Sequence, residues 1–578
     1  MNALEKYKFW LKDSYFDEKT KEELLAIAED KNEIEERFYR DLEFGTGGLR
    51  GIIGAGTNRM NIYTVRKATQ GLANYILKEK TQEKGVAIAF DSRNMSHEFA
   101  QEAALCLAAN GIRAYIFPSL RPTPELSFAL RKLGCTAGIV VTASHNPPEY
   151  NGYKVYWEDG AQITAPRDRQ IIEEVQAVTD FDMVKTMSCE NAVRAGLYEV
   201  ISPEMDDCYM EELKKLVVRP EVIRRQAKNL KIVYTPLHGT GNIPVRRILR
   251  ELGFEQVYVV KEQELPDGDF PTVSYPNPED KKAFALALKL AEEVDADVVL
   301  ATDPDADRLG IYAKDTRNGV YKSFTGNMSG MIILEYLLSQ KKELGLLPDN
   351  GAIVTTIVSG KMSEEIAKRY KMKRIETLTG FKYIGEQIKF FEQNHSYDFQ
   401  FGYEESYGCL VGTHARDKDA IVAVMALCEA AAYYKEKGIT LCEQMENLYE
   451  TYGFFKENLC TVTLKGQDGA KKIASIMERI RKEVPQIIGG KRVTQFRDYQ
   501  KGILMDYVKE EQKTTGLPKS NVLYFELEDG TWCCIRPSGT EPKIKFYIGI
   551  QGENELQAQK QIEEMTEAVK NCFVGEEI

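Results

Sequence analysis

Short apolar runs alternate with amphipathic stretches along the chain from about residue 85. The runs GVAIAF at 85–90 and AYIFPS at 114–119 predict strands. Between them, MSHEFAQEAALCLAANG at 95–111 predicts a helix with Ser96 as its N-cap and Gly111 at its C-terminal end. A strand, a helix and a second strand in this order are typical of an α/β fold with neighbouring parallel strands.

The same order recurs twice further along the chain. One repetition covers 230–242, 254–260 and 296–313, and another covers 351–360, 374–394 and 398–408. The segment after Tyr452 differs, because a charged helical stretch is followed by several strands and a closing helix. Its strand at 543–550 alternates apolar with other residues, which predicts a half-exposed strand.

These patterns predict three α/β units followed by a smaller α+β domain. The predicted parts are an N-terminal helical extension (1–40), α/β domains at 41–205, 206–320 and 321–450, and an α+β domain at 451–578. Each α/β unit carries a polar loop directly after an apolar strand: TASHNP, DPDADR and GYEESYG. Ligands of open α/β sheets bind beyond the carboxyl ends of the strands, so we expect these loops to meet in one site.

Composition limits the classes of partner and the compartment. The 76 Lys and Arg against 88 Asp and Glu give a net charge of −12, which argues against nucleic acid and anionic membranes as partners. No apolar run approaches the roughly 20 residues of a membrane span, and the N-terminus lacks the pattern of a signal peptide. The 11 cysteines lack C-x-x-C spacing, so we expect a reducing cytoplasm and neither zinc nor a disulfide framework.

The run GIVVTASHNPP at 138–148 sends an apolar strand into a loop that Pro147 and Pro148 stiffen. Ser144 at the end of a core strand, beside His145, is a candidate reactive hydroxyl. From this segment alone, the alternative is an ordinary turn in which Ser144 and Asn146 cap backbone groups.

The run ATDPDADRLG at 301–310 places Asp303, Asp305 and Asp307 at alternate positions after a strand. Three carboxylates so close together repel one another unless a cation lies between them, and oxygen ligands with open positions favour Mg²⁺. Arg308 occupies the position where a calcium-binding EF-hand needs glycine, so that type of site is excluded.

Three further loops are candidates for binding phosphate or a nucleotide. The run RPSGTEP combines an arginine with hydroxyls and a glycine turn, which suits a phosphate monoester; the plainer interpretation is a hairpin turn. The runs EFGTGGLRG and HGTGNIP are glycine-rich, but Arg50 and Pro244 stand where a dinucleotide-binding fingerprint needs glycine. Nucleotide binding is therefore unsupported.

Taken together, TASHNP, DPDADR, GYEESYG and RPSGTEP resemble, in order, the phosphoserine, metal, sugar and phosphate loops of the α-D-phosphohexomutase family of phosphoglucomutases and phosphomannomutases. The resemblance covers nearly all of the chain beyond residue 40. It implies three similar α/β domains with mixed sheets and a smaller α+β C-terminal domain around a central cleft. Pro304 and the extra Tyr403 beside Glu404 resemble the branch of longer phospho-sugar mutases.

The resemblance implies roles for individual residues. Ser144 would carry the transferable phosphate and, with Asp303, Asp305 and Asp307, bind Mg²⁺. Arg308 would stabilise the passing phosphoryl group, and Lys154 and His145 are the candidates for general acid–base catalysis. Sugar and phosphate contacts would come from Arg50, Asp307, Thr379, Gly380, Glu404, Ser406, Lys418, Arg536, Ser538, Gly539 and Thr540.

The implied reaction interconverts glucose 1-phosphate and glucose 6-phosphate, with glucose 1,6-bisphosphate as intermediate and activator. Mannose and pentose phosphates are the alternative substrates, and the oligomeric state stays open. Two other classes remain: a non-catalytic sugar-phosphate regulator and a metal-dependent phosphatase of the haloacid dehalogenase type. The phosphatase needs Thr or Val two residues after its second aspartate, where this chain has Asp307 or Leu309.

Overall fold

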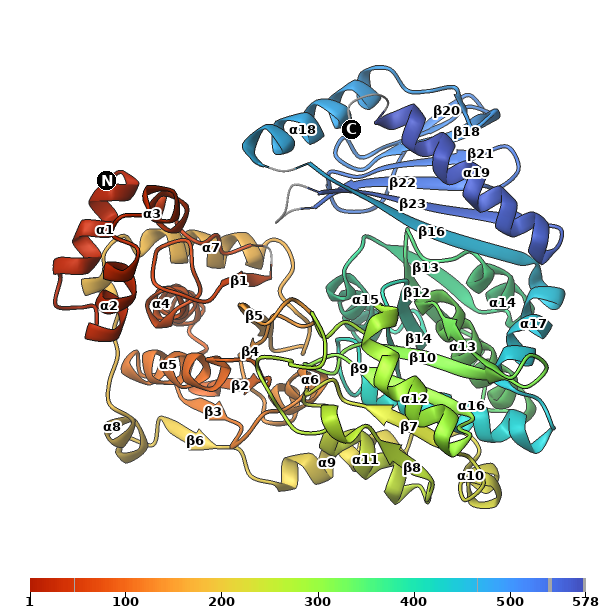
Figure 1. Ribbon diagram of the computed structural model, residues 1–578, viewed down its shortest axis with the longest axis horizontal. Helices are drawn as coiled ribbons and strands as arrows, with labels where there is room; N and C mark the ends of the chain where they lie inside the picture. The colour runs from red at the N-terminus through yellow and green to blue at the C-terminus, as the bar shows by residue number, and fades with distance from the viewer. Residues whose placement is uncertain (46, 465, 539–542, 575–578) are drawn as a thin grey trace. The chain divides into compact units, whose positions relative to one another are not determined.

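The computed structural model describes residues 1–45, 47–464, 466–538 and 543–574 (Figure 1). The chain divides into two compact units. One contains residues 1–348 and 381–442, and the other contains residues 349–380 and 443–578.

The N-terminal extension folds into α1 (Ala3–Lys12), α2 (Glu18–Ala26) and α3 (Lys31–Phe38). Asn2, Asp17 and Asp30 cap these helices by accepting hydrogen bonds from backbone N–H groups in the first turn. The helices enclose an aromatic cluster in which Trp10 stacks on Phe16 at 4.2 Å and meets the ring of Tyr63 edge-on. Tyr63 belongs to α4, so the cluster joins the extension to the first α/β domain.

The first α/β domain is built on a mixed sheet in the order β1-β5-β4-β2-β3-β6. The strands β4, β2, β3 and β6 are parallel, and β5 and β1 run antiparallel to their neighbours. Helices α4, α5 and α6 pack against one another or against the strands, and α7 packs on α4 (Figure 1). The bounds are β1 Gly48–Ile52, β2 Val86–Phe90, β3 Ala114–Ile116, β4 Ala137–Val141, β5 Tyr150–Trp157, β6 Tyr198–Val200, α4 Ile62–Lys78, α5 Ser96–Ala109, α6 Thr123–Lys132, α7 Arg167–Ala177 and α8 Cys189–Arg194.

The second α/β domain repeats the plan with a mixed sheet in the order β11-β10-β9-β7-β8. Here β9, β7 and β8 are parallel, and β10 and β11 are antiparallel. The bounds are β7 Ile232–Thr235, β8 Val257–Val259, β9 Val298–Thr302, β10 Leu309–Asp315, β11 Val320–Phe324, α9 Glu204–Lys214, α10 Pro220–Gln226, α11 Asn242–Glu251 and α12 Ala285–Val294.

The elements of the third α/β domain follow β11 in the chain. In the first unit, β14 (Asp398–Glu404) and β15 (Gly408–Val411) form an antiparallel hairpin, accompanied by α13 (Gly326–Glu343), α15 (Phe381–Asn394) and α16 (Ala420–Glu436). In the second unit, β12 (Gly351–Thr356) and β13 (Lys373–Thr377) pair in parallel around α14 (Met362–Tyr370). Helix α17 spans Leu441–Tyr452.

The C-terminal domain is a β-rich layer with two helices. Its antiparallel sheet has the order β16-β23-β22-β21-β18-β19-β20, and β17 pairs with β18. The bounds are β16 Phe454–Thr463, β17 Ile487–Ile488, β18 Lys491–Asp498, β19 Ile503–Asp506, β20 Glu511–Thr514, β21 Leu523–Leu527, β22 Trp532–Pro537, β23 Lys543–Gly552, α18 Gly466–Lys482 and α19 Glu555–Phe573. The fold class predicted from the sequence, three α/β domains with mixed sheets and a smaller C-terminal domain, is confirmed.

Two local predictions are wrong. Ser96 is the first helical residue of α5, not its N-cap; Met95 is the cap, and the Ser96 hydroxyl donates to Asp91 at 2.7 Å. The strand β23 is more buried than its alternation suggests, because Tyr547 and Gly549 are also covered. Trp532 on the neighbouring strand lies against Gly549 and shields it from solvent.

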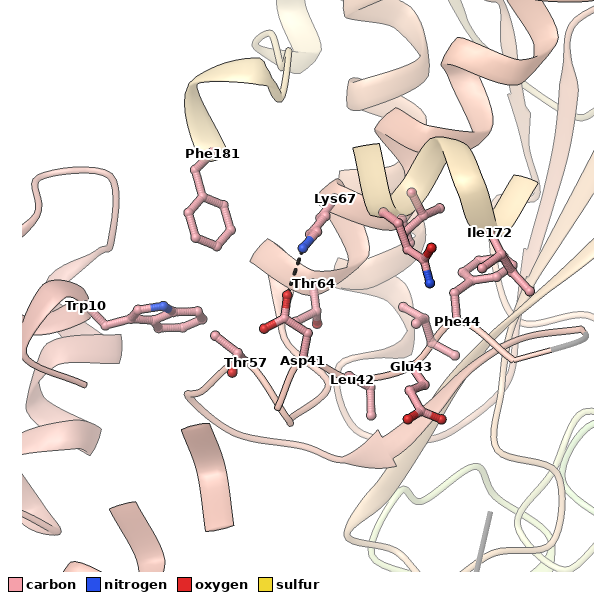
Figure 2. Close-up of a pocket in the computed structure, with 14 residues that line it drawn as sticks. Trp10, Asp41, Leu42, Glu43, Phe44, Thr57, Thr64, Lys67, Ile172 and Phe181 are labelled. Carbon is pink, nitrogen blue, oxygen red and sulfur yellow. Dashed lines mark hydrogen bonds and ion pairs between the residues drawn. The ribbon is translucent and has the colours of Figure 1, made fainter. Parts of the chain in front are cut away.

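A cavity of about 340 Å³ lies between the N-terminal helices and the first α/β domain (Figure 2). Its walls are mainly apolar, from Trp10, Phe44, Ile172 and Phe181 among others. The Lys67 ammonium binds the carboxylate of Asp41 at 2.9 Å inside it. None of the predicted site residues that the structure describes lines this cavity, so the candidate chemistry lies elsewhere.

We expect Trp10→Ala to lower the free energy of unfolding by about 3–5 kcal/mol, because it removes a large buried ring from the aromatic cluster. In thermal unfolding, the variant should show a lower melting temperature for the transition that includes the first domain. The control is Leu25→Ala on α2, where Leu25 is 60% exposed and the change should cost under about 0.5 kcal/mol. Equal effects of the two substitutions would contradict the packing described here.

Candidate active site

The acidic loop Asp303–Arg308 follows directly from the buried strand β9. Pro304 blocks a helix, and the chain turns back with a hydrogen bond from the Ala306 N–H to the Asp303 carbonyl at 2.9 Å. The Asp303 carboxylate accepts from the N–H groups of Asp307 and Arg308 at 3.1 and 3.0 Å. The turn thus forces three carboxylates that are at most 2% exposed onto one side of a short loop.

Each of three successive carbonyls of this loop is held by a different helix start. The bonds run from Thr240 N to Pro304 O (2.8 Å), from Thr123 N to Asp305 O (2.9 Å) and from Ala420 N to Ala306 O (3.1 Å). Thr123 and Ala420 are the first residues of α6 and α16, and Thr240 precedes α11. Since these helices belong to the three α/β domains, the acidic loop is a point where all three are tied together.

Two lysines partly neutralise the acidic loop. Lys154 Nζ on β5 donates to Asp305 at 2.8 Å, and Lys418 Nζ lies 3.1 Å from Asp307. Burial alone would lower the pKa of Lys154, but Asp305 and Asp307 outweigh it and raise that pKa. Burial, together with the charges of Asp307 and Asp305, raises the pKa of Asp303 well above its ordinary value. The positive charges of the two lysines therefore do not fully compensate the negative charges of the three carboxylates.

The arrangement fits a divalent cation. One oxygen from each of Asp303, Asp305 and Asp307 can be chosen so that all lie within 4.8 Å of one another. Among the described residues, Oδ1 of Asp305 and Oδ1 of Asp307 have no hydrogen-bond donor although both are buried. Buried carboxylate oxygens without donors are costly unless a cation binds them, and an all-oxygen site suits Mg²⁺.

Ser144 lies against this acidic loop. Its hydroxyl donates to Asp303 Oδ2 at 2.7 Å and lies 3.1 Å from Nδ1 of His145. Its backbone is left-handed, with φ +53°, and is stabilised by a bond from its N–H to the Thr142 hydroxyl at 2.8 Å. Non-glycine residues with this backbone are uncommon and gather at functional sites. The Ser144 hydroxyl therefore bonds the acidic loop and does not cap a backbone group of its own turn.

Arg93 fixes the serine loop, and the sequence interpretation missed it. Its guanidinium donates to four carbonyls of that loop: Ser144 (2.7 Å), Pro147 (2.8 Å), Tyr150 (3.0 Å) and Asn146. Arg93 is 3% exposed and pairs with Asp91 at 3.4 Å. Asp91 and Arg93 follow β2, which runs parallel to its neighbour β4. Because ligands of such sheets bind beyond the carboxyl ends of the strands, this position in the sequence could have identified both residues.

The other predicted residues of the first unit surround the same loop. Arg308 pairs with Glu279, and its pKa is raised because Glu279, Asp307 and other acids outweigh its burial. Arg50 donates to Asn146 at 3.4 Å. Partial burial, followed by the charges of Arg308 and Arg50, lowers the pKa of His145 well below its ordinary value. The imidazole is therefore neutral at pH 7.

The sugar loop connects β14 and β15. Glu404 ends β14 and is 5% exposed. Burial alone would lower the pKa of Lys418, but Asp307, Asp417 and Glu404 outweigh it and raise that pKa. Ser406 follows in the turn between the two strands. A second connection missed in the sequence runs from Tyr156, whose hydroxyl donates to Asp417 at 2.7 Å, while Asp417 binds Lys418 at 2.8 Å. These contacts orient Lys418 toward the acidic loop.

The remaining predicted residues belong to the second unit. Thr379 and Gly380 precede α15, and Gly380 has φ +121°. Arg536 is the penultimate residue of β22. Just beyond this strand, the Ser538 N–H donates to the Lys543 carbonyl at 2.7 Å. Gly539 and Thr540 lie outside the described residues.

Family models of three consecutive domains match the chain. They are the phosphoglucomutase/phosphomannomutase α/β/α domains I, II and III, at residues 41–181, 207–318 and 325–452. The chain belongs to the phosphoglucomutase/phosphomannomutase family. The family resemblance inferred from the four loops is thereby confirmed. The N-terminal helices α1–α3 precede the matched region.

Relatives in this family align over nearly their whole length. A protein named phosphoglucomutase from Staphylococcus saprophyticus is 37% identical over 92% of this chain and 94% of its own. One of the same name from Staphylococcus epidermidis is 38% identical over 90% and 92%. The open form of pp63/parafusin, a phosphoglucomutase from Paramecium, shares the fold at TM-score 0.67 and 20% identity, covering 93% of this chain and 95% of that one. Across the described helices, none is long and apolar enough to cross a membrane.

We expect Asp303→Asn to separate metal binding from folding. An asparagine there keeps an oxygen for the Asp307 and Arg308 N–H groups, and its amide N–H can donate to the Ser144 hydroxyl oxygen in place of the bond that Asp303 accepts. The substitution also removes one of three repelling charges. In a chelator the variant should therefore melt at or above the wild-type temperature. With excess Mg²⁺ the wild type should gain stability by mass action and the variant should gain far less.

Thermal unfolding with and without Mg²⁺ tests this crossover. An equal Mg²⁺-dependent shift in both proteins would mean that Asp303 is not a ligand.

Proposed function

We propose that this protein is a phosphoglucomutase that interconverts glucose 1-phosphate and glucose 6-phosphate through a phosphoserine at Ser144 and a sugar bisphosphate. The observation that carries the proposal is the 2.7 Å bond between the Ser144 hydroxyl and Asp303 within the acidic loop. Relatives named phosphoglucomutase, 34–38% identical over at least 90% of this chain, support the same reaction.

Asp303, Asp305 and Asp307, with a phosphate oxygen on Ser144, would hold Mg²⁺, which when bound neutralises the charge of the transferring phosphoryl group. Other features of this chain position Ser144 beside that site. Arg93 holds four carbonyls of the serine loop, and the left-handed backbone of Ser144 turns its hydroxyl toward the acidic loop. Phosphoryl transfer needs such in-line positioning more than covalent assistance.

In the proposed transfer, the bond between Ser144 Oγ and phosphorus breaks and a bond from a sugar hydroxyl oxygen to phosphorus forms. The hydroxyl proton leaves the sugar, and Ser144 Oγ ends protonated. The bisphosphate then reorients and returns its other phosphate to Ser144. Glucose 1,6-bisphosphate is accordingly the proposed activator, since it can phosphorylate an unmodified Ser144.

His145 and Lys154 are the proposed acid–base residues. The neutral imidazole of His145, 3.1 Å from Ser144 Oγ, supports proton transfer at the serine. The raised pKa of Lys154 keeps it protonated, which supports a role as proton donor or fixed cation. Arg308 is proposed to stabilise the passing phosphoryl group.

The substrate is proposed to be bound by two separate sets of residues. Arg536, Ser538, Gly539 and Thr540 would bind the phosphate that is not reacting, and Glu404 and Ser406 the sugar hydroxyls. Arg50, Asp307, Thr379, Gly380 and Lys418 would complete the contacts to the bisphosphate. The domain boundaries proposed above, at 41–205, 206–320, 321–450 and 451–578, give each of the four loops its own domain.

Phosphomannomutase and phosphopentomutase activities remain the alternatives within the same mechanism. Rates with glucose, mannose, ribose and deoxyribose 1-phosphates distinguish them, and a pentose phosphate that reacts faster than glucose 1-phosphate would replace the hexose. Net release of inorganic phosphate without isomer exchange would instead identify a phosphatase.

We expect Ser144→Ala to abolish steady-state mutase activity while the fold is kept, because only the phosphate carrier is lost. Intact-mass analysis of the wild type should show a fraction heavier by one phosphoryl group, and peptide mapping should place it on Ser144. His97→Ala, at a solvent-exposed residue in the first turn of α5, serves as a control and should stay active. An active Ser144→Ala enzyme with phosphate elsewhere would overturn the mechanism.

A further pair of substitutions separates phosphate binding from sugar binding. Arg536→Ala removes a charge-assisted phosphate contact, about 1.5–3 kcal/mol, and should lower kcat/KM for all sugar phosphates by a similar factor. Glu404→Gln keeps the size but removes the anionic acceptor, so glucose and mannose phosphates, which differ at one hydroxyl, should converge in rate. Steady-state kinetics on both sugars decides; the opposite pattern would mean that the two loops have exchanged roles.

A further inference from the structure

We propose that the glycine-rich loop Pro236–Gly241 is a positioning device that sets the spacing of the metal-binding carboxylates. The inference rests on the proposed Mg²⁺ site at Asp303, Asp305 and Asp307. The loop contains no proposed ligand of the substrate or the metal, yet it touches the acidic loop through its backbone.

Hydrogen bonds to residues outside the acidic loop hold this glycine-rich loop in place. Leu237 and His238 are both buried and both have left-handed backbones, with φ +46° and +60°. The two ring nitrogens of His238 bond the Leu265 carbonyl and the Thr272 hydroxyl, each at 3.0 Å. The His238 N–H donates to the Gln263 carbonyl at 2.9 Å. A loop held on so many sides cannot move aside easily.

Gly239 is the closest point of approach to the acidic loop. A Cβ on Gly239 would lie 2.5 Å from Pro304 Cα and 2.8 Å from the Pro304 carbonyl oxygen. The next residue, Thr240, donates its N–H to that same carbonyl at 2.8 Å. The two backbones are therefore in direct contact, and a side chain at Gly239 would have to push Pro304 away.

Gly241 makes a comparable contact one residue before the acidic loop. A Cβ there would lie 2.5 Å from the Thr302 hydroxyl oxygen and 2.6 Å from the Tyr234 hydroxyl oxygen, which bond each other at 2.9 Å. These obstacles are side-chain atoms, whereas the obstacle at Gly239 is backbone. A side chain at Gly239 would therefore push the acidic loop directly, whereas one at Gly241 would act on it indirectly through Thr302, the residue before Asp303.

A shift at Pro304 acts on the metal site directly, because Pro304 lies between the ligands Asp303 and Asp305. Mg²⁺ demands near-ideal octahedral geometry and tolerates little displacement of its ligands. A change of spacing should therefore weaken Mg²⁺ binding far more than it weakens the fold. This consequence distinguishes positioning from ordinary packing.

The experiment measures Mg²⁺ affinity by isothermal titration calorimetry and Mn²⁺ binding by electron paramagnetic resonance, on the full chain without substrate. The variants are Gly239→Ala, Gly241→Ala and the control Gly253→Ala. Gly253 follows α11 with φ +92° and nothing within 4 Å of an added Cβ, so its substitution strains the same domain away from the acidic loop. Thermal unfolding in chelator gives the stability loss of each variant.

We expect Gly239→Ala to raise the Kd for Mg²⁺ at least tenfold and Gly241→Ala to raise it less. Tyr234→Phe together with Thr302→Ala should restore part of the affinity of Gly241→Ala, because both obstructing oxygens are removed. Gly253→Ala should bind as the wild type does. If Gly239→Ala does not fold, Gly241→Ala and its rescue carry the test.

Folded Gly239→Ala with wild-type affinity would overturn the inference, as would a Gly253→Ala protein that loses as much affinity. A wild type that binds neither Mg²⁺ nor Mn²⁺ would instead overturn the proposed metal site, so the two failures are distinguishable.

Discussion

The constraint on which the first unit depends is the burial of three carboxylates within five residues of one loop. Such charges cannot remain in a protein interior unless hydrogen bonds and cations surround them. The chain meets this need from several sides. The first domain supplies Lys154 and the Thr123 hydroxyl, which donate to Asp305, and the third supplies Lys418 beside Asp307. The backbone N–H groups of Thr123, Ala420 and Thr240 hold the loop itself through its carbonyls. The same contacts that solvate the acids also fix the three α/β domains around them, so stability and site geometry share one set of interactions.

Ser144 shows how that arrangement prepares chemistry. A strand alone would leave its hydroxyl in an ordinary turn, but Arg93 gathers four carbonyls of the loop and the left-handed backbone aims the hydroxyl at Asp303. Arg93 suits this task because one planar guanidinium presents several donors at fixed angles. The serine loop and the acidic loop are therefore rigid before any substrate binds.

The sequence predicted those elements whose structure depends on residues close together in the chain. The strand before Ser144 and the alternate aspartates were readable because apolar runs and repeated carboxylates are visible within ten residues, and the fold class followed from their repetition. Arg93, Thr123 and Asp417 were missed because their roles depend on partners 51, 182 and 261 positions away in the chain. Ser96 was misassigned because Asp91 competes for its hydroxyl, so the side chain that the local pattern expects at a cap serves a contact to β2 instead.

The charge balance of the site is compatible with the proposed phosphate on Ser144. Three carboxylates facing two lysines leave one uncompensated negative charge, and a divalent cation turns this into one positive charge. The proposed phosphoserine would add nearly two negative charges at pH 7, so the sum with both metal and phosphate returns to about one negative charge. Arg308 pairs with Glu279 and Arg93 with Asp91, and Asp417 shares Lys418 with Asp307, so these further charges add no positive excess. The proposed Mg²⁺ and phosphate would thus cancel each other's charge. A phosphate bound there would not be held by a large positive excess, which suits a site proposed to pass a phosphate to a sugar and take one back.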